Sequence, residues 1–306
     1  MKTKILISIV GPTAIGKTAL SIHLAQAFST EILSADSRQF YKEIPIGTAA
    51  PSKKELAAAP HHFIHNRSIN EVYSVGDYER EAIEMLDKLF KDHKLLILVG
   101  GSGLYIKSLI EGLDNFPEIN QEIREQLNDK LLNEGLEPLK MQLEQLDPDY
   151  YNKIDHNNPH RVIRALEVCI GTGKTFSSFL NMPKPSRAFQ TISIGLTAPR
   201  QEIYERINRR VDIMMDEGLL EEAQELYPHR RLNALNTVGY KELFSFFEGR
   251  IDLETAVEEI KMNSRRYAKR QLTWFKKNKE TTWFDYKTPF SEIENFIKSK
   301  LQEKYR

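Results

Sequence analysis

The fold of this sequence is decided by the stretch Gly11-Pro12-Thr13-Ala14-Ile15-Gly16-Lys17-Thr18. It follows an apolar run at 5–10, which predicts a buried strand, and it precedes a helical pattern at 19–28. Two glycines and a Lys-Thr pair between a strand and a helix form a phosphate-binding loop, or P-loop. We therefore expect its backbone amides to bind a diphosphate, with Lys17 on the terminal oxygens and Thr18 as a ligand of Mg²⁺.

The first third of the chain alternates strands with helices. Strands are predicted at 31–35 and 95–99, and helices at 77–93 and 104–111. This order predicts an α/β fold, a P-loop NTPase-like parallel sheet flanked by helices. Ligands bind at the carboxyl ends of such strands, so we expect the P-loop, the loop at 36–39 and the loop at 100–103 to meet there.

The middle of the chain shows only helical periodicity and is bounded by Pro117 on one side and by Pro183 and Pro185 on the other. This predicts a helical insertion domain at 117–185 within a core domain of 1–116 and 186–306, whose C-terminal part is helical. The insertion is predicted to hold helices at 119–132, 138–146 and 161–170. The later elements are predicted as strands at 191–196 and 282–286 and helices at 200–216, at 252–274 and from the last strand to Leu301.

Composition sets limits on the class of protein. Lys plus Arg and Asp plus Glu both number 43, so a nucleic-acid surface would have to come from local clustering. The single cysteine, Cys169, excludes a disulfide framework and a Cys-based zinc site, and we expect it in the core. The chain enters its first strand directly, and its apolar runs are too short for a membrane span. We expect a monomer in the cytoplasm, with no membrane contact.

Asp36 is the acidic residue best placed for chemistry. A carboxylate at the end of a strand beside a P-loop either holds Mg²⁺ through water or accepts a proton from a substrate. The strand at 95–99 ends in Gly-Gly and not in an acidic residue, which weakens an ATPase interpretation. The alternative is that Asp36 caps a helix.

Three other motifs are weaker. Gly100-Gly101-Ser102-Gly103 brings amides and one hydroxyl close to a ligand, or forms a tight turn that Ser102 caps. Gly171-Thr172-Gly173-Lys174-Thr175 looks like half a P-loop, but it follows a helix, so we interpret it as a helix C-terminal turn. His61 and His62 are adjacent and would point apart, which favours loop residues or residues on the tRNA side over a metal site.

Basic residues gather in two places. Residues 261–279 carry eight Lys or Arg side chains and no acidic one, interleaved with Tyr267, Trp274 and Phe275, which favours a polyanionic partner. Arg161 and Arg164 share one helix face, as a phosphate clamp or as a solvated surface. Arg206 and Arg210 are phosphate ligands or part of an exposed helix face.

A set of motifs in a fixed order resembles the bacterial tRNA dimethylallyltransferases (tRNA isopentenyltransferases, the MiaA family). Besides the P-loop, it comprises DSRQFY at 36–41, GTAAP at 47–51, PHH at 60–62, VGGSGLY at 99–105, RVIRALEV at 161–168, VGYKE at 238–242 and RRYAKRQLTWF at 265–275. The resemblance runs from about residue 4 to about residue 286. Phe40, Ala50, Ser102 and His160 replace Val, Lys, Thr and Gln, which are common in the family, and none of these changes removes a group that the chemistry requires.

The resemblance implies transfer of a dimethylallyl group from dimethylallyl diphosphate to N6 of the adenosine 3′ of the anticodon, with Mg²⁺ as cofactor. The partner is the anticodon stem-loop of tRNA, whose adenine is flipped into a channel between the core and the helical insertion. Asp36 would be the general base, acting with Lys17 and Ser102. The residues implied in tRNA contact are Asp36, Ser37, Arg38, Gln39, Ser102, Arg124, His160, Arg161, Val162, Ile163, Arg164, Arg266 and Arg270.

Other classes of function share part of this pattern. A small-molecule P-loop kinase, which would bind ATP, needs no basic aromatic helix. An enzyme that prenylates free AMP or ADP would share the chemistry without needing the insertion. A non-catalytic RNA-binding module has no use for Asp36 beside an intact P-loop.

Overall fold

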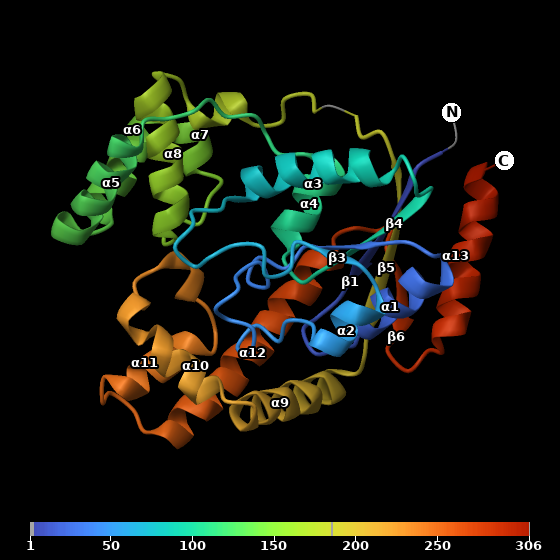
Figure 1. Cartoon of the computed structure of the whole chain (residues 1–306). Helices are drawn as coiled ribbons and strands as arrows, with labels where there is room; N and C mark the ends of the chain where they lie inside the picture. The colour runs from blue at the N-terminus through green and yellow to red at the C-terminus, as the bar shows by residue number, and fades with distance from the viewer. Residues whose placement is uncertain (1–2, 185, 306) are drawn as a thin grey trace. The chain divides into compact units, whose positions relative to one another are not determined.

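The computed structural model describes residues 3–184 and 186–305. The chain divides into two compact units, a core unit of Met1–Glu111 with Arg187–Arg306 and a helical unit of Gly112–Ser186. The predicted limits of the insertion were 117 and 185, and Pro185 lies outside the described residues. Figure 1 shows the path of the chain.

The core unit is built on one six-stranded sheet. Its strands are β1 (Ile5–Val10), β2 (Ile32–Ser34), β3 (His61–His62), β4 (Leu95–Val99), β5 (Gln190–Thr197) and β6 (Thr282–Asp285). They lie in the order β3-β2-β4-β1-β5-β6, and every pair is parallel, which confirms the predicted sheet. The loop predicted at His61 and His62 is wrong, because these residues pair with Ile32 and Leu33 as an edge strand.

Most helices of the core unit lie close to where periodicity placed them, but the short helices at 53–58, 219–226 and 240–247 were not predicted. The helices of this unit are α1 (Lys17–Ala27), α2 (Lys53–Ala58), α3 (Val75–Leu89), α4 (Gly103–Glu111), α9 (Arg200–Asp216), α10 (Leu219–Leu226), α11 (Tyr240–Phe247), α12 (Leu253–Phe275) and α13 (Phe290–Tyr305), with 3₁₀ turns η2 (Tyr227–His229) and η3 (Asn233–Leu235). Helix α3 begins two residues earlier than predicted, because Ser74 and Asp77 form a reciprocal capping box.

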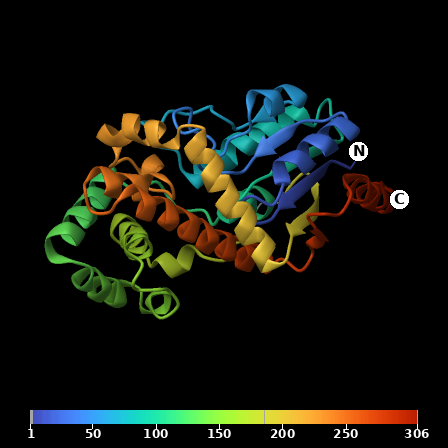
Figure 2. The same ribbon diagram turned by 90° about the horizontal axis from the view of Figure 1, so that it is seen from below.

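Helices cover both faces of the sheet. One face packs against α1, α9 and α13, and the other packs against α3 and α4 (Figure 1). Helices α9 and α12 contact each other, as the second view also shows (Figure 2). A third apolar cluster joins α10, α11 and α12 to the segment that contains Ile44. None of the described helices is long and apolar enough to cross a membrane.

The helical unit contains no strand among its described residues. Its helices are α5 (Gln121–Glu134), α6 (Glu137–Leu146), α7 (Pro148–Tyr151) and α8 (Pro159–Thr172), followed by the 3₁₀ turn η1 (Phe176–Phe179). Cys169 is buried in its core, as predicted. Gly173 ends α8 at a φ of 69°, so the turn interpretation of 171–175 is confirmed.

Candidate active site

The P-loop connects β1 to α1 in a backbone conformation that requires its glycines. Gly11 has a φ of 146°, and a Cβ there would lie 2.6 Å from the carbonyl oxygen of Leu196. Gly16 has a φ of 107° and directly precedes α1, so the loop ends at a helix N-terminus. The result is the phosphate-binding geometry that the motif predicts.

Lys17 lies deep in the site. Its Nζ donates a hydrogen bond to the carbonyl oxygen of Pro12 at 2.8 Å. Burial lowers the pKa of Lys17 to about 8; the charge of Asp36 opposes this change, and the charge of Arg210 adds to it. A second negative group beside Lys17, such as a phosphate, would favour its charged form.

Asp36 follows β2, and the residues after it form a turn, not a helix. Its Oδ1 accepts a hydrogen bond from the backbone N–H of Arg38 at 3.2 Å. The helix-cap alternative is therefore wrong. Ser102 supports the same turn from the next strand, because its hydroxyl accepts the N–H of Ser37 at 2.9 Å and lies 3.0 Å from the Ser37 hydroxyl.

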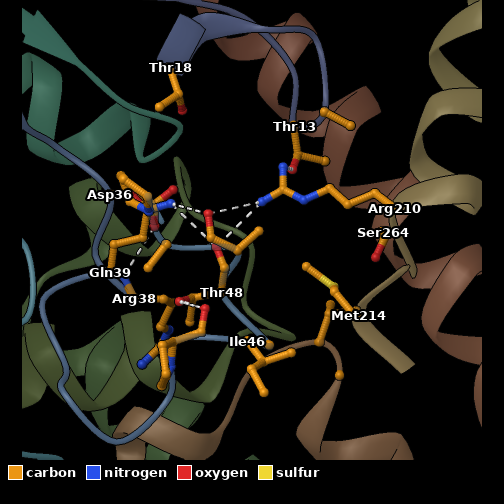
Figure 3. A pocket seen from close by; sticks show the side chains of 18 of the residues that line it. Thr13, Thr18, Asp36, Arg38, Gln39, Ile46, Thr48, Arg210, Met214 and Ser264 are labelled. Atoms are coloured by element: carbon orange, nitrogen blue, oxygen red, sulfur yellow. Dashed lines mark hydrogen bonds between the residues drawn. The ribbon is translucent and has the colours of Figure 1, made fainter. Parts of the chain in front are cut away.

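A single cavity of about 1270 Å³ joins these groups. It is lined by Thr13 to Thr18 of the P-loop, by Asp36 to Gln39, by residues 45–53, and by side chains of α9 and α12, all from the core unit. Figure 3 shows Thr13, Thr18, Asp36 and Arg210 around it. The expected meeting of the three loops at the carboxyl edge of the sheet is confirmed, with Gly100 representing the third loop. Ser102 is not among the lining residues.

Two arginines of α9 face the P-loop. They are one helical turn apart, and Arg206 Nε donates to the carbonyl oxygen of Ala14 at 2.8 Å. Arg210 Nη1 donates to the Thr13 hydroxyl at 3.1 Å, and burial lowers the pKa of its guanidinium. The intervening Arg209 is exposed. The alternative of an exposed helix face thus fails for Arg206 and Arg210.

Arg38 and Gln39 build the wall of the cavity. The Arg38 guanidinium donates to the carbonyl oxygens of Asn233 at 2.9 Å and Ala234 at 3.1 Å. Gln39 Nε2 donates to the carbonyl oxygen of Ala49 at 3.1 Å. Both side chains thus line the cavity while bonding the chain itself, and their implied roles in tRNA contact stay predictions.

Sequence reasoning missed Glu222, whose carboxylate holds the segment at 46–47 that lines the cavity. The buried Glu222 carboxylate accepts the backbone N–H groups of Ile46 and Gly47, each at 2.9 Å, and the Tyr240 hydroxyl at 2.5 Å. A Cβ on Gly47 would lie 2.4 Å from that hydroxyl oxygen. Gly47 and Tyr240 belong to two motifs of the family resemblance, GTAAP and VGYKE, but the sequence alone gave them no task.

Helical spacing within the run at 261–279 predicts a basic stripe of Arg266, Lys269, Arg270 and Lys277, and the structure confirms that all four are exposed. Outside this stripe, Lys261 pairs with Asp212 and Glu258, each at 2.9 Å, and Arg265 donates to Asn208 at 2.7 Å. A groove of about 410 Å³ on the outer side of α12 is lined by exposed residues: Arg266, Lys269, Arg270, Thr273, Trp274 and Lys277.

The candidate residues of the helical unit fall into three groups. His160 and Arg161 are exposed at the start of α8. Arg124 and Arg164 lie 3.4 and 3.2 Å from Oε2 of the buried Glu167. Two further residues do not fit their implied role in tRNA contact: the side chains of Val162 and Ile163 are 0% and 3% exposed and pack in the core of the unit.

The oxygen donors in the cavity fit a small hard cation. Among the described residues no group of three or more His, Cys, Asp or Glu side chains could hold a metal ion. The Thr18 hydroxyl and the Asp36 carboxylate both line the cavity. Mg²⁺ binds through one or two such oxygens and completes its shell with phosphate and water.

Comparison with known proteins gives one consistent result. A sequence profile of the IPP transferase family matches residues 39–278. The chain is 61% identical to a tRNA dimethylallyltransferase of Christiangramia forsetii, over 97% of this chain and 98% of that protein.

Two solved structures have the same fold. The first is the full-length tRNA isopentenylpyrophosphate transferase of Bacillus halodurans, at 39% identity and a TM-score of 0.74, covering 99% of this chain and 98% of that one. The second is a eukaryotic dimethylallyltransferase acting on tRNA, at 28% identity and a TM-score of 0.79, covering 94% of this chain and 75% of that one.

Proposed function

Because the chain belongs to the family of tRNA dimethylallyltransferases, it is a tRNA prenyltransferase that forms N6-dimethylallyladenosine, and we propose how its cavity carries out the reaction. The proposed donor is dimethylallyl diphosphate, and the proposed target is the adenosine 3′ of the anticodon. We propose that the enzyme acts as a monomer. It works in the cytoplasm, where tRNA is made and used.

The P-loop holds the diphosphate, which is the leaving group. Its amides and the N-terminus of α1 bind the phosphate oxygens, while Lys17, Arg206 and Arg210 surround them with positive charge. The bond from the allylic carbon to the diphosphate oxygen breaks, and the electron pair leaves with that oxygen. Stabilising the charge that develops on the diphosphate is the main electrostatic task of the site.

Asp36 accepts the proton. As the adenine N6 forms its bond to the allylic carbon, one of its protons passes to the Asp36 carboxylate, and the neutral secondary amine remains. The hydrogen bonds to Arg38 N–H and, through Ser37, to Ser102 hold the turn that carries this carboxylate. Ser102 is thus a support for the base turn in this proposal.

The Thr18 hydroxyl would hold Mg²⁺, with the Asp36 carboxylate in the same cavity. When bound, the ion supplies further positive charge for the departing diphosphate.

Exposed cations would hold the RNA. The outer side of α12 offers Arg266, Lys269 and Arg270 beside Trp274, and the start of α8 offers His160 and Arg161. Phosphate contacts of this kind position a nucleic acid without reading its sequence. The target adenine must leave the anticodon stack to reach a carboxylate inside the cavity.

One observation carries the proposal: the cavity brings Asp36 to the P-loop lysine, whereas β4 ends in Gly100-Gly101 without a carboxylate for ATP hydrolysis. The test is a transfer assay with Mg²⁺, labelled dimethylallyl diphosphate and an unmodified tRNA that has adenosine 3′ of its anticodon. Parallel reactions replace the tRNA with AMP, or the donor with ATP.

Label in tRNA alone is the expected result. Label in AMP would leave the chemistry in place and overturn the acceptor. Phosphate release from ATP without any transfer would restore the kinase interpretation.

A further inference from the structure

Gln271 lies between the two loops on which the reaction depends. It belongs to α12, its side chain is buried at 5% exposure, and its carbonyl Oε1 accepts the backbone N–H of Thr13 in the P-loop at 2.8 Å. Its amide Nε2 donates to the carbonyl oxygen of Gly101, after β4, at 2.9 Å. One side chain thus spans the gap between the diphosphate loop and the loop after the neighbouring strand.

Both polar atoms of the Gln271 amide have a backbone partner, and only the orientation with Oε1 at Thr13 and Nε2 at Gly101 satisfies both partners. Thr13 N–H requires an acceptor, and the Gly101 carbonyl requires a donor. A carboxylate at position 271 would serve Thr13 and repel Gly101, and an apolar side chain would leave both backbone groups without this partner. Glutamine is the uncharged side chain of this length with one acceptor and one donor at its tip.

Gly101 connects this bridge to Asp36. A Cβ built on Gly101 would lie 2.4 Å from Nε2 of Gln271 and 3.5 Å from Oδ2 of Asp36, so both side chains lie against the same residue. The Tyr267 hydroxyl, one turn earlier on α12, donates to the same Gly101 carbonyl at 3.3 Å. Asp36 therefore lies beside the residue that α12 holds, and Ser102 of the same loop bonds the turn that follows Asp36.

We propose that Gln271 is a positioning residue that sets the separation between the diphosphate in the P-loop and the carboxylate of Asp36. This inference rests on the proposed function and adds to it a residue that touches neither substrate. The distance between leaving group and base must suit one transition state, and a misplacement of about 1 Å can cost about 100-fold in rate. A loss of the bridge should therefore appear in kcat and leave substrate binding nearly unchanged.

The test compares variants of the full chain in steady-state transfer, with tRNA or dimethylallyl diphosphate varied while the other is saturating. Gln271→Met keeps the length and removes both polar atoms, and kcat should fall about 100-fold while each KM stays within about threefold. Gln271→Glu keeps the acceptor for Thr13, and its kcat should fall about tenfold. The control is Phe244→Leu, which creates a cavity at a buried residue of α11 outside the site. Its activity is compared with that of the Gln271 variants that have a similar Tm.

A second comparison tests the contact itself. Gly101→Ala places its methyl group against the Gln271 amide and should lower kcat, whereas the double variant with Gln271→Ala has room for that methyl group. The double variant should be no slower than Gln271→Ala alone.

Two results would overturn the inference while wild-type transfer remains intact: Gln271→Met keeping as much kcat as Phe244→Leu, or losing activity through KM alone. Additive losses in the double variant would also overturn it. Failure of the proposed function is a separate result, because the wild-type protein itself would then transfer no label to tRNA.

Discussion

Two sets of polar residues that the sequence singled out are built in opposite ways. One set lines the cavity of the core unit, and the other lies at the start of α8 in the helical unit. In the cavity, Lys17, Asp36 and Arg210 are brought together from distant parts of the chain, and burial changes the pKa of both cations. On α8, Arg161 is exposed, close in sequence to its fellow candidates. Buried groups that depend on one another should give large, specific losses when changed, whereas exposed cations should give small losses that salt reduces.

The largest effect is expected at Asp36. Asp36→Ala should fold and bind tRNA normally, while kcat falls about 1,000-fold, because a general base typically contributes 10²–10⁴-fold. Asp36→Asn keeps the shape without the base and should lose almost as much. Single-turnover transfer and a separate tRNA-binding measurement check this, and near-normal turnover of either variant would remove Asp36 from the mechanism.

Arg210 should come next, and its neighbour on the helix provides the control. Arg210→Ala removes a buried cation that bonds Thr13, and kcat/KM for dimethylallyl diphosphate should fall about 100-fold. Arg209→Ala removes an exposed cation one residue away and should stay within about twofold. Steady-state kinetics with varied dimethylallyl diphosphate at saturating tRNA measure kcat/KM for both variants. Equal losses would mean that the net charge of the helix matters and the position of the arginine does not.

Lys17 should show the cost of burying a charge. Lys17→Met should be inactive yet more stable than wild type at pH 7, by on the order of 2 kcal/mol, because the native site disfavours the charged amine. The pKa of Lys17 falls from 10.5 to about 8 on folding, so between these values the unfolded chain holds more protons. Wild-type stability therefore rises with pH across this window.

Thermal unfolding at several pH values measures the difference in stability between the wild type and Lys17→Met. The difference between wild type and variant should be full below about pH 8 and should close by about pH 10.5. Inorganic pyrophosphate should stabilise the wild type more than the variant. A gap that does not change with pH would show that the lysine charge is not its source.

The sequence predicted those parts of the site whose position follows from the order of strands and loops and from the spacing of residues within a motif. The P-loop and Asp36 follow predicted strands, and the parallel sheet brings them together as expected. Gln271 and Glu222 carried no such pattern, since their roles come from backbone groups 170 or more residues away in the chain.

Other misses have local causes. Strand β3 has two residues, too few for any period to appear. Val162 and Ile163 came with a family motif whose helix turns them inward, whereas the helical period itself already separates them from Arg161 and Arg164.

The smallest effects are expected on the helical unit. Arg161→Ala should weaken tRNA binding about threefold, leave kcat unchanged, and lower the salt slope of the binding constant by about one. Arg164→Ala should have a similar or smaller effect, because its guanidinium already lies 3.2 Å from Glu167. Lys153→Ala, an exposed cation of the same unit outside the candidate residues, is the control and should change neither quantity. If Arg161→Ala instead lowered kcat and left the salt slope intact, α8 would be part of the reaction chemistry, and the contrast between the two regions would fail.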